Sequence, residues 1–301
     1  MDYIVDMEEV IKNFENKYGK DDVYTEKFRD KFAKWITNFK TDEEKKIFLK
    51  LMKEYEYFNR KWFKEAFLKL YKQCLSQGIK LENSKILSMS KDNEADSSIE
   101  YFGLLRELDR SENLGFYSDT LIRDIKGIKD AENVLFFDDI SGSGGTVKKY
   151  LTRNSEYLKG KNVFVNVCII TSKALEDLTK YCKTEKSFKI IINYYELKNK
   201  SIDDNSIICI NEKNSILRIE ESLWGKGNNQ ILGYKDSQLL ITFFHNTPNN
   251  TISSFWFSES FYNQAYKNFY GEKKWNELFG RYRPPKRKLQ NMLKKRGDSI
   301  W

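Results

Sequence analysis

The sequence contains, near its centre, the stretch Val134-Leu135-Phe136-Phe137-Asp138-Asp139-Ile140-Ser141-Gly142-Ser143-Gly144-Gly145-Thr146-Val147. Four apolar residues precede two adjacent carboxylates, and a loop of small residues follows them. A continuous apolar run of this length is typical of a fully buried strand in a parallel sheet. A helix-compatible run over residues 147–158 comes next. Because open α/β sheets bind their ligands at the carboxyl ends of such strands, we expect a binding site here.

The loop consists of residue types that suit a phosphate group. Gly142, Gly144 and Gly145 have no Cβ, so their backbone N–H groups can approach an anion closely. Ser143 and Thr146 add hydroxyl donors. A helix that opens after the loop would also present the free amides and the positive dipole end of its first turn. The loop is therefore predicted to hold a phosphate.

Asp138 and Asp139 need a different partner, because two carboxylates repel a phosphate. They suit sugar hydroxyls, which donate to a carboxylate, or a magnesium ion with its waters. A phosphate loop beside such acids describes a site for a phosphorylated ribose. The alternative is a strand–turn–helix whose glycines serve only the turn. A P-loop does not fit, because no Gly-Lys-Ser/Thr is present, and in a dinucleotide site the acid would follow the glycines.

Apolar residues, Asp-Asp and a Ser/Thr-Gly-x-Thr loop in this order resemble the phosphoribosyl diphosphate (PRPP) motif of type I phosphoribosyltransferases. The resemblance implies that Asp138 and Asp139 contact the ribose hydroxyls and hold Mg²⁺ through water. It implies that the 5′-phosphate is bound by the loop residues Ser141, Gly142, Ser143, Gly144, Gly145 and Thr146. In one respect the sequence departs from the family, since Gly142 stands where some purine enzymes carry a carboxylate base.

The loop after the first core strand binds the pyrophosphate of PRPP in the resembled family. Here the apolar run Lys85–Met89 predicts that strand, and position nominates Ser90 and Lys91 for the pyrophosphate. Lys91 is the only cation of the polar loop 90–98, and a pyrophosphate site needs positive charge or free amides. A solvated loop lysine is the alternative.

A second stretch with site character, residues 245–251, follows the strand expected over Gln238–Phe244. His245 is the only histidine of the chain and is a candidate general base or base contact, with a structural histidine as the alternative. Asn246, Asn249 and Asn250 carry amides that can read a nucleobase edge or form turns.

Together with the Asp-Asp loop and the helical N-terminal region, this stretch resembles phosphoribosyltransferase-like proteins of bacterial conflict systems, including ones encoded beside retrons. That resemblance covers about residues 30–260 and implies an effector in anti-phage defence.

The remaining pattern predicts an α/β protein with a mostly parallel, phosphoribosyltransferase-type sheet flanked by helices. We expect a helical cap or partner-binding region over residues 1–83, the α/β domain over 84–260 and a basic tail over 261–301. Four helices are expected in the first region, starting near residues 7, 28, 41 and 60. Further strands are expected at Asn162–Thr171, Phe188–Tyr194 and, shorter, Ile207–Ile210, with helices at Ile99–Leu108 and Lys173–Cys182.

Charge is concentrated near the C-terminus. The net charge is +8, and residues 273–296 contain ten Lys and Arg against Glu277 alone, which leaves 42 basic and 43 acidic residues elsewhere. Trp275, Phe279 and Tyr282 lie among these cations. Cations interleaved with aromatic residues favour contact with RNA or DNA by phosphate binding and stacking. A solvated tail or a dock for an acidic protein is the alternative.

The composition bounds the cellular context. No apolar run reaches the roughly 18 residues that a membrane helix needs, and the acidic N-terminus has no signal-peptide character. The four cysteines form no CxxC pair, and Cys168 and Cys209 lie in apolar runs that predict buried positions. A reducing cytoplasm fits this usage.

Two functions remain open at this point. The first is a phosphoribosyltransferase-like enzyme that uses PRPP or a ribose phosphate with Mg²⁺ and an unidentified acceptor. The second is a non-catalytic module of the same fold, acting as a sensor or as an interaction subunit in a nucleoprotein complex.

Overall fold

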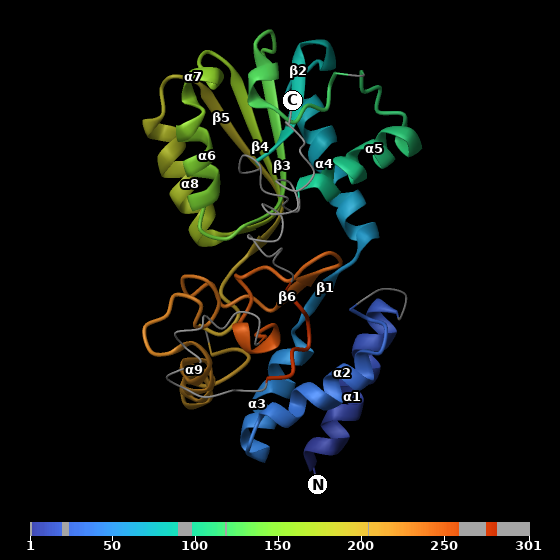
Figure 1. The fold of residues 1–301 in the computed structure, drawn as a ribbon, viewed down its shortest axis with the longest axis vertical. Coiled ribbons are helices and arrows are strands. Elements are labelled where there is room, and N and C mark those ends of the chain that lie inside the picture. Colours follow the sequence, from blue (N-terminus) through green and yellow to red (C-terminus); the bar gives the residue numbers. More distant parts are fainter. Residues whose placement is uncertain are drawn as a thin grey trace, which may run out of the picture.

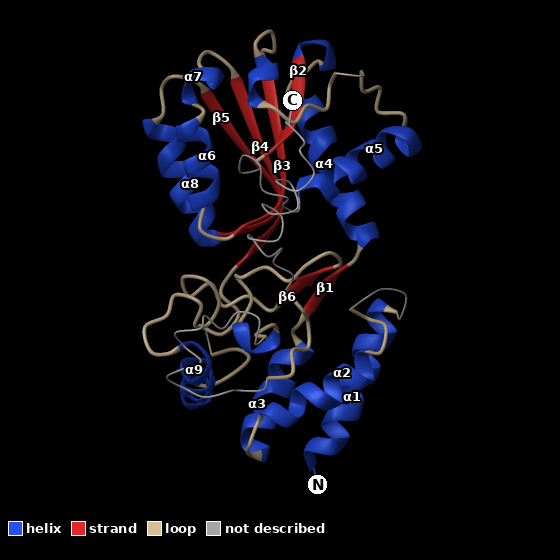
Figure 2. Cartoon of the chain, in the orientation of Figure 1, coloured by secondary structure: helices blue, strands red, loops and turns tan. Residues whose placement is uncertain are grey.

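The chain folds into two lobes that are stacked along its long axis (Figure 1). The structure is a computed structural model, and it describes residues 2–19, 24–89, 98–117, 119–203, 205–258 and 275–281. The upper lobe contains a four-stranded sheet with helices on both faces. The lower lobe contains mainly helices and loops around a two-stranded sheet (Figure 2).

The upper sheet is parallel throughout, as the sequence predicts. Its strands, in spatial order, are β2 (Ser84–Ser88), β3 (Asn133–Ser141), β4 (Asn162–Thr171) and β5 (Lys189–Lys198). The apolar run that opens the Asp-Asp stretch forms the middle of β3, and Phe136 pairs with Val165 of β4. The expected strand over 162–171 coincides with β4. The α/β fold class is thus confirmed.

The strand order reverses between β2 and β3. Ile86 of β2 accepts a hydrogen bond from the amide of Ile122 (3.0 Å) and donates to the carbonyl of Thr120 (2.8 Å), so Leu121 pairs with the outer edge of β2. The chain therefore leaves β2 toward that edge and returns on the other side as β3. The carboxyl ends of β2 and β3 flank a topological switch point, where doubly wound folds bind their ligands.

Helices cover both faces of this sheet. One face packs against α4 (Arg60–Ser76) and α5 (Ser98–Glu112), and the other against α6 (Gly145–Arg153), α7 (Ser155–Leu158) and α8 (Ser172–Thr184) (Figure 1). Alternate side chains of β3 point to the two faces, as the pleat of a strand requires. Burial on both faces explains why the strand reads as an unbroken apolar run.

The lower lobe joins segments from both ends of the chain. Its elements are α1 (Asp2–Tyr18), α2 (Phe28–Trp35), α3 (Asp42–Lys53), α9 (Ile210–Trp224), β1 (Glu56–Phe58) and β6 (Ile241–Phe243), with β1 and β6 parallel. Short 3-10 turns lie at Ile36–Asn38, Leu81–Asn83, Ile125–Ile128 and Ser253–Phe255. Thr41 caps α3 by accepting from the amide of Glu44, whose side chain accepts in return, the capping box that the sequence predicts.

Residues at the two ends of the sequence share one apolar core. Phe279, which is fully buried, stacks on Tyr55 with ring centroids 4.7 Å apart and on Phe28 at 6.1 Å. Helices α1 to α3 therefore pack with residues 275–281, whereas α4 belongs to the upper lobe. The helical region expected over residues 1–83 is divided between the lobes.

Two local expectations are wrong. Residues 207–210 form no strand; instead Cys209 is the N-cap of α9, a helix that the sequence analysis does not predict. Cys209 is also exposed, although Cys168 is buried as expected. The apolar side chains of Ile207 and Ile208 pack into the lower core from an irregular segment, which is why a short apolar run there suggested a strand.

Within the described residues, no helix combines the length and the apolar character required to cross a membrane.

Candidate functional site

The loop between β3 and α6 presents unpaired backbone donors at the switch point. Gly144 adopts a φ of 68° directly before α6, and a Cβ there would lie 3.0 Å from Leu178. Within the described chain, the amides of Gly142, Ser143 and Gly144 donate to no backbone carbonyl. The amide of Gly145 has only a long contact, 3.4 Å, with Ser143 Oγ. These donors and the N-terminus of α6 favour an anion.

The hydroxyl of Ser141 supplies an independent sign of a ligand. Ser141 is 4% exposed, yet its Oγ has no hydrogen-bond partner among the described residues. A buried hydroxyl without a partner costs free energy unless something else bonds to it. Since Ser141 lines the pocket described next, a bound ligand can satisfy this hydroxyl.

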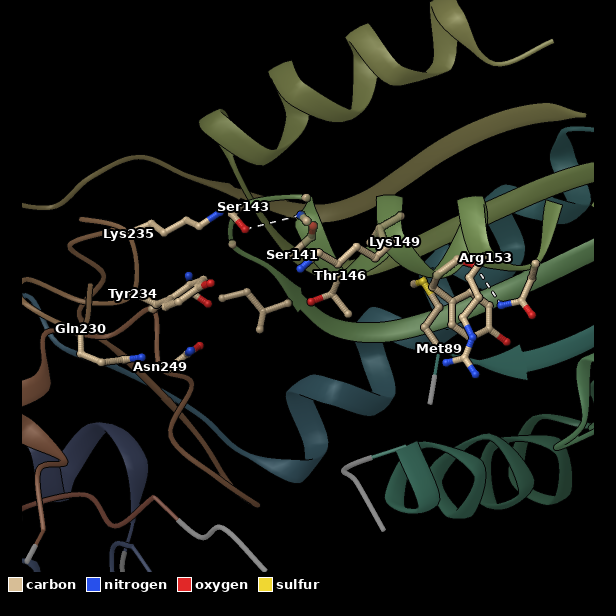
Figure 3. A pocket seen from close by; sticks show the side chains of 18 residues that line it. Met89, Ser141, Ser143, Thr146, Lys149, Arg153, Gln230, Tyr234, Lys235 and Asn249 are labelled. Atoms are coloured by element: carbon tan, nitrogen blue, oxygen red, sulfur yellow. Dashed lines mark hydrogen bonds between the residues drawn. The ribbon is translucent and has the colours of Figure 1, made fainter. Parts of the chain in front are cut away.

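A pocket of about 850 Å³ opens between the two lobes at this loop. Figure 3 shows the side chains of both of its walls. The upper wall consists of Met89, residues 140–147 and a face of α6 with Lys149, Tyr150, Arg153 and Asn154. The lower wall consists of Gln230, Tyr234, Lys235, Asn249 and Asn250. Three of the residues that line this pocket are cations and none is an acid, so its charge also favours an anion.

Gly142 is in close contact with the lower wall. A Cβ at Gly142 would lie 2.0 Å from Nδ2 of Asn250 and so could not be accommodated without movement of that amide. Only glycine therefore fits at this position while Asn250 keeps its place. This contact gives a structural reason why Gly142 carries no side chain where the resembled purine enzymes carry an acid.

The two acids lie beside the pocket and are not among the residues that line it. They point to opposite faces of the sheet, because they are neighbours on β3. Asp138 Oδ1 accepts from the amide of Asp139 (3.0 Å), and Asp139 Oδ1 accepts from the amide of Ile140 (2.7 Å). Asp139 Oδ2 lies 3.3 Å from Nε2 of His245. Asp139 is thus held by an interaction inside the protein.

His245 links the two lobes through this contact. Its side chain is 2% exposed, and its Nε2 also lies 3.1 Å from the hydroxyl of Tyr101 on α5. Burial opposes ionisation of Asp139, but the bonds from His245 and Tyr101 outweigh it and hold the pKa of this carboxyl below its ordinary value of 3.8. Asp139 is therefore charged at neutral pH. The position of His245 fits the structural alternative, since it orients an acid and does not line the pocket.

The remaining predicted site residues either do not line the pocket or lie outside the described residues. Asn246 does not line the pocket, whereas its neighbours Asn249 and Asn250 do. Ser90 and Lys91 lie outside the described residues, immediately after Met89 at the end of β2. The pyrophosphate role expected of them remains a prediction.

The basic stretch 273–296 is described only over residues 275–281. Within these, Leu278 is 1% exposed and Phe279 is fully buried, while Trp275 donates from Nε1 to the carbonyl of Ser254 (3.1 Å). The expectation that Phe279 stacks on a nucleobase is wrong, because its ring is enclosed by the lower core. The basic residues that follow Arg281 lie outside the described residues.

Sequence alone does not identify the two cations of α6 in the upper wall or most residues of the lower wall. Lys149 and Arg153 are four residues apart, so helical periodicity after the loop would have placed them on one face of α6. Gln230, Tyr234 and Lys235 carry no comparable signal, because only the packing of the lobes brings them to the loop.

The acids suit a magnesium ion only in combination with a ligand. Within the described part of the chain, no three His, Cys, Asp or Glu residues form a group that could hold a metal. Mg²⁺ is commonly held by one or two carboxylates together with substrate phosphates and waters. The carboxylate of Asp138 or of Asp139 could serve in that mode with a ligand phosphate, and the two acids alone do not form a complete protein site.

Comparison with known proteins gives one family match. The family described as PRTase-CE matches residues 32–281, which include the upper lobe, the lower lobe without α1 and the start of α2, and both walls of the pocket. No curated protein matches the chain.

Proposed function

Because the chain belongs to the PRTase-CE family, a phosphoribosyltransferase-like family, we propose that it binds PRPP or another ribose phosphate together with Mg²⁺. The observation that carries this proposal is the loop over residues 141–146. It combines unpaired amides, a buried hydroxyl without a partner and the N-terminus of α6 at a topological switch point. A phosphate monoester satisfies all three.

In this proposal each part of the site has one task. The loop and Thr146 hold the 5′-phosphate. The ribose would lie across the end of β3, where Asp138 from one face of the strand and Asp139 from the other can contact its hydroxyls. His245 and Tyr101 fix the carboxylate of Asp139 in its charged state. Mg²⁺, held by the acids and the ligand phosphates, would stabilise negative charge on the pyrophosphate.

The corresponding reaction is a displacement at the anomeric carbon of the ribose. The bond from C1 to the pyrophosphate oxygen breaks, and pyrophosphate leaves with the electron pair. A new bond forms from a nucleophilic atom of the acceptor, whose proton passes to solvent. The protein's part is to fix the ribose and its phosphate and to place negative charge beside the positively charged transition state.

Ligand binding should raise the melting temperature. At a PRPP concentration 100 times Kd, with Mg²⁺ present, the gain is about 2.7 kcal/mol, which corresponds to roughly 5 °C for a chain of this size. Thr146→Val and Asp139→Asn should each reduce the shift, because they remove a phosphate donor and a charged sugar contact. Thr184→Val, at the end of α8 and outside the pocket, serves as the control. The measurement is differential scanning fluorimetry, and no shift at millimolar PRPP would refute the proposal.

A non-catalytic binding module is the second candidate. The observations that favour it are the engagement of Asp139 with His245 and the absence of both acids from the pocket lining. This candidate predicts a PRPP-dependent shift without pyrophosphate release. Incubation with labelled PRPP and cell extract separates the two, because label transferred to an acceptor together with released pyrophosphate identifies the enzyme.

The wider role proposed for the protein is that of an effector in bacterial antiviral defence. The support is the resemblance of the Asp-Asp loop and of residues 247–251 to proteins of conflict systems. Cells that carry the wild-type chain with its neighbouring genes should then restrict phage plating. Equal plating on cells that carry the Thr146→Val variant would show that the phosphate site is not required.

A further inference from the structure

The segment that carries Tyr234 and Lys235 in the lower wall has a backbone conformation that non-glycine residues rarely adopt. Within residues 232–238, four non-glycine residues have positive φ: Leu232 (55°), Lys235 (56°), Asp236 (60°) and Gln238 (54°). Gly233 has a φ of 80°. A side chain in the left-handed region costs energy, and such residues persist only where the surroundings fix them.

Two hydrogen bonds to other parts of the chain and one within the segment fix its conformation. Leu232 donates its amide to the buried carboxylate of Glu220 on α9. The amide of Tyr234 donates to the carbonyl of Asn249 (2.6 Å), and the amide of Gln238 donates to the carbonyl of Leu232 (2.8 Å). Residues 232–238 are therefore held against Asn249 and Asn250, although their conformation is unfavourable. Strain that is maintained in this way is common at ligand-binding positions.

The side chain that this segment presents to the phosphate loop is Lys235. Figure 3 shows its ammonium end directed toward Ser143 across the pocket. Lys235 makes no ion pair within the described residues, whereas its neighbour Asp236 pairs with Lys200 at 2.5 Å. The loop at residues 141–146 contains no cation of its own. Lys235 is thus placed to supply the positive charge that the loop lacks.

We propose that Lys235 is a phosphate-binding residue contributed by the lower lobe, so that a phosphate monoester is clamped between Lys235 and the loop at residues 142–146. This inference rests on the proposed function, because it concerns the same phosphate. The bound phosphate joins the lobes, since it contacts α6 above and the segment 232–238 below. The left-handed backbone at Lys235 serves to aim the ammonium group into the pocket.

Two substitutions separate the charge of Lys235 from its backbone conformation. Lys235→Asn removes the charge but retains a residue that tolerates the left-handed region. Lys235→Arg retains the charge. Isothermal titration with ribose 5-phosphate, and with PRPP and Mg²⁺, should show about a tenfold loss of affinity for Lys235→Asn, the size of one charge-assisted contact. Lys235→Arg should bind within about threefold of wild type on the same reasoning.

The matched control is Lys226→Asn, which removes an exposed lysine from the turn that precedes the segment and lies outside the pocket. Salt dependence gives a second readout. Wild type and Lys226→Asn should lose affinity as ionic strength rises, and Lys235→Asn should lose less, because part of the screened attraction is gone.

The outcomes distinguish this inference from the function on which it rests. If wild type binds ribose 5-phosphate and Lys235→Asn binds it equally well, the clamp is wrong and the proposed function stands. If Thr146→Val abolishes binding while Lys235→Asn behaves like Lys226→Asn, the loop alone holds the phosphate. If wild type binds neither ribose 5-phosphate nor PRPP, both proposals fall together.

Discussion

Replacement of Glu220 by alanine should lower the free energy of unfolding by about 4 kcal/mol, because it leaves buried donors without a partner. Glu220 is fully buried on α9. Its Oε1 accepts from the amide and the hydroxyl of Ser254, each at 2.7 Å, and its Oε2 accepts from the amide of Leu232. The carboxylate therefore ties together α9, the turn at residues 253–255 and the strained segment below the pocket.

Chemical denaturation at constant pH measures this loss. Glu221→Ala is the matched control, since the neighbouring carboxylate is only partly buried and should change the stability by less than about 0.5 kcal/mol. Equal midpoints for Glu220→Ala and wild type would show that the buried hydrogen bonds do not stabilise the lower lobe.

The stability that Glu220 contributes should also depend on pH. Burial raises the pKa of the Glu220 carboxyl above its ordinary value of 4.5, despite the bonds from Ser254 and Leu232. A group whose pKa is raised on folding contributes its full stability below the unfolded pKa and loses it as pH rises through the folded pKa. The difference between wild type and Glu220→Ala should thus be largest near pH 4 and decrease toward pH 8. Glu220→Gln cannot ionise and should not show this trend.

The upper lobe was predictable because its local signals agree. In β3 and β4, runs of apolar residues buried on both faces leave no ambiguity about their type, and β4 begins and ends at the residues expected. The Asp-Asp stretch and its glycines lie at the end of β3, where the carboxyl end of a parallel strand predicts a site. In the lower lobe, only the N-terminal helices gave a comparably clear signal, because Phe28, Phe32 and Trp35 repeat at helical spacing.

The lower lobe was less predictable because its signals are mixed. Helix α9 buries Glu220 between the apolar residues Ile216 and Leu223, so a charged residue interrupts its apolar face. In residues 275–281, Leu278 and Phe279 are buried in the core and Trp275 packs against it, although the basic sequence of this stretch predicts a solvated tail. Lys235 lies in the pocket wall because of a backbone conformation fixed by distant residues, and no local pattern encodes that contact.

These differences bear on how the site works. The phosphate loop belongs to the regular upper lobe, whereas the opposite wall and the partner of Asp139 come from the irregular lower lobe. His245 therefore makes the charged state of an upper-lobe acid depend on the packing of the lower lobe. Substitutions that loosen the lower lobe should weaken ligand binding even where they lie far from the phosphate loop.

Gly233→Ala should have the second largest effect on stability, a loss of about 3 kcal/mol. Gly233 has a φ of 80°, and a Cβ there would lie 2.3 Å from the carbonyl oxygen of Asn250. The left-handed backbone alone costs an alanine about 1 kcal/mol, and the forced displacement of a backbone carbonyl costs roughly 2 more. Since Asn250 packs on Gly142, that displacement also reaches the phosphate loop, so the affinity for ribose 5-phosphate should fall.

Gly227→Ala separates the two causes, because Gly227 has a similar φ of 75° but no atom within 4 Å of the added Cβ. The free energy of unfolding of Gly227→Ala should fall only by the cost of the left-handed backbone, about 1 kcal/mol. This variant should bind ribose 5-phosphate like wild type. Denaturation and titration of both variants give the comparison. If the two alanine variants were equally stable and bound equally well, the contact between residues 233 and 250 would not be close. In that case a change in the packing of the lower wall would not affect the phosphate loop through Asn250.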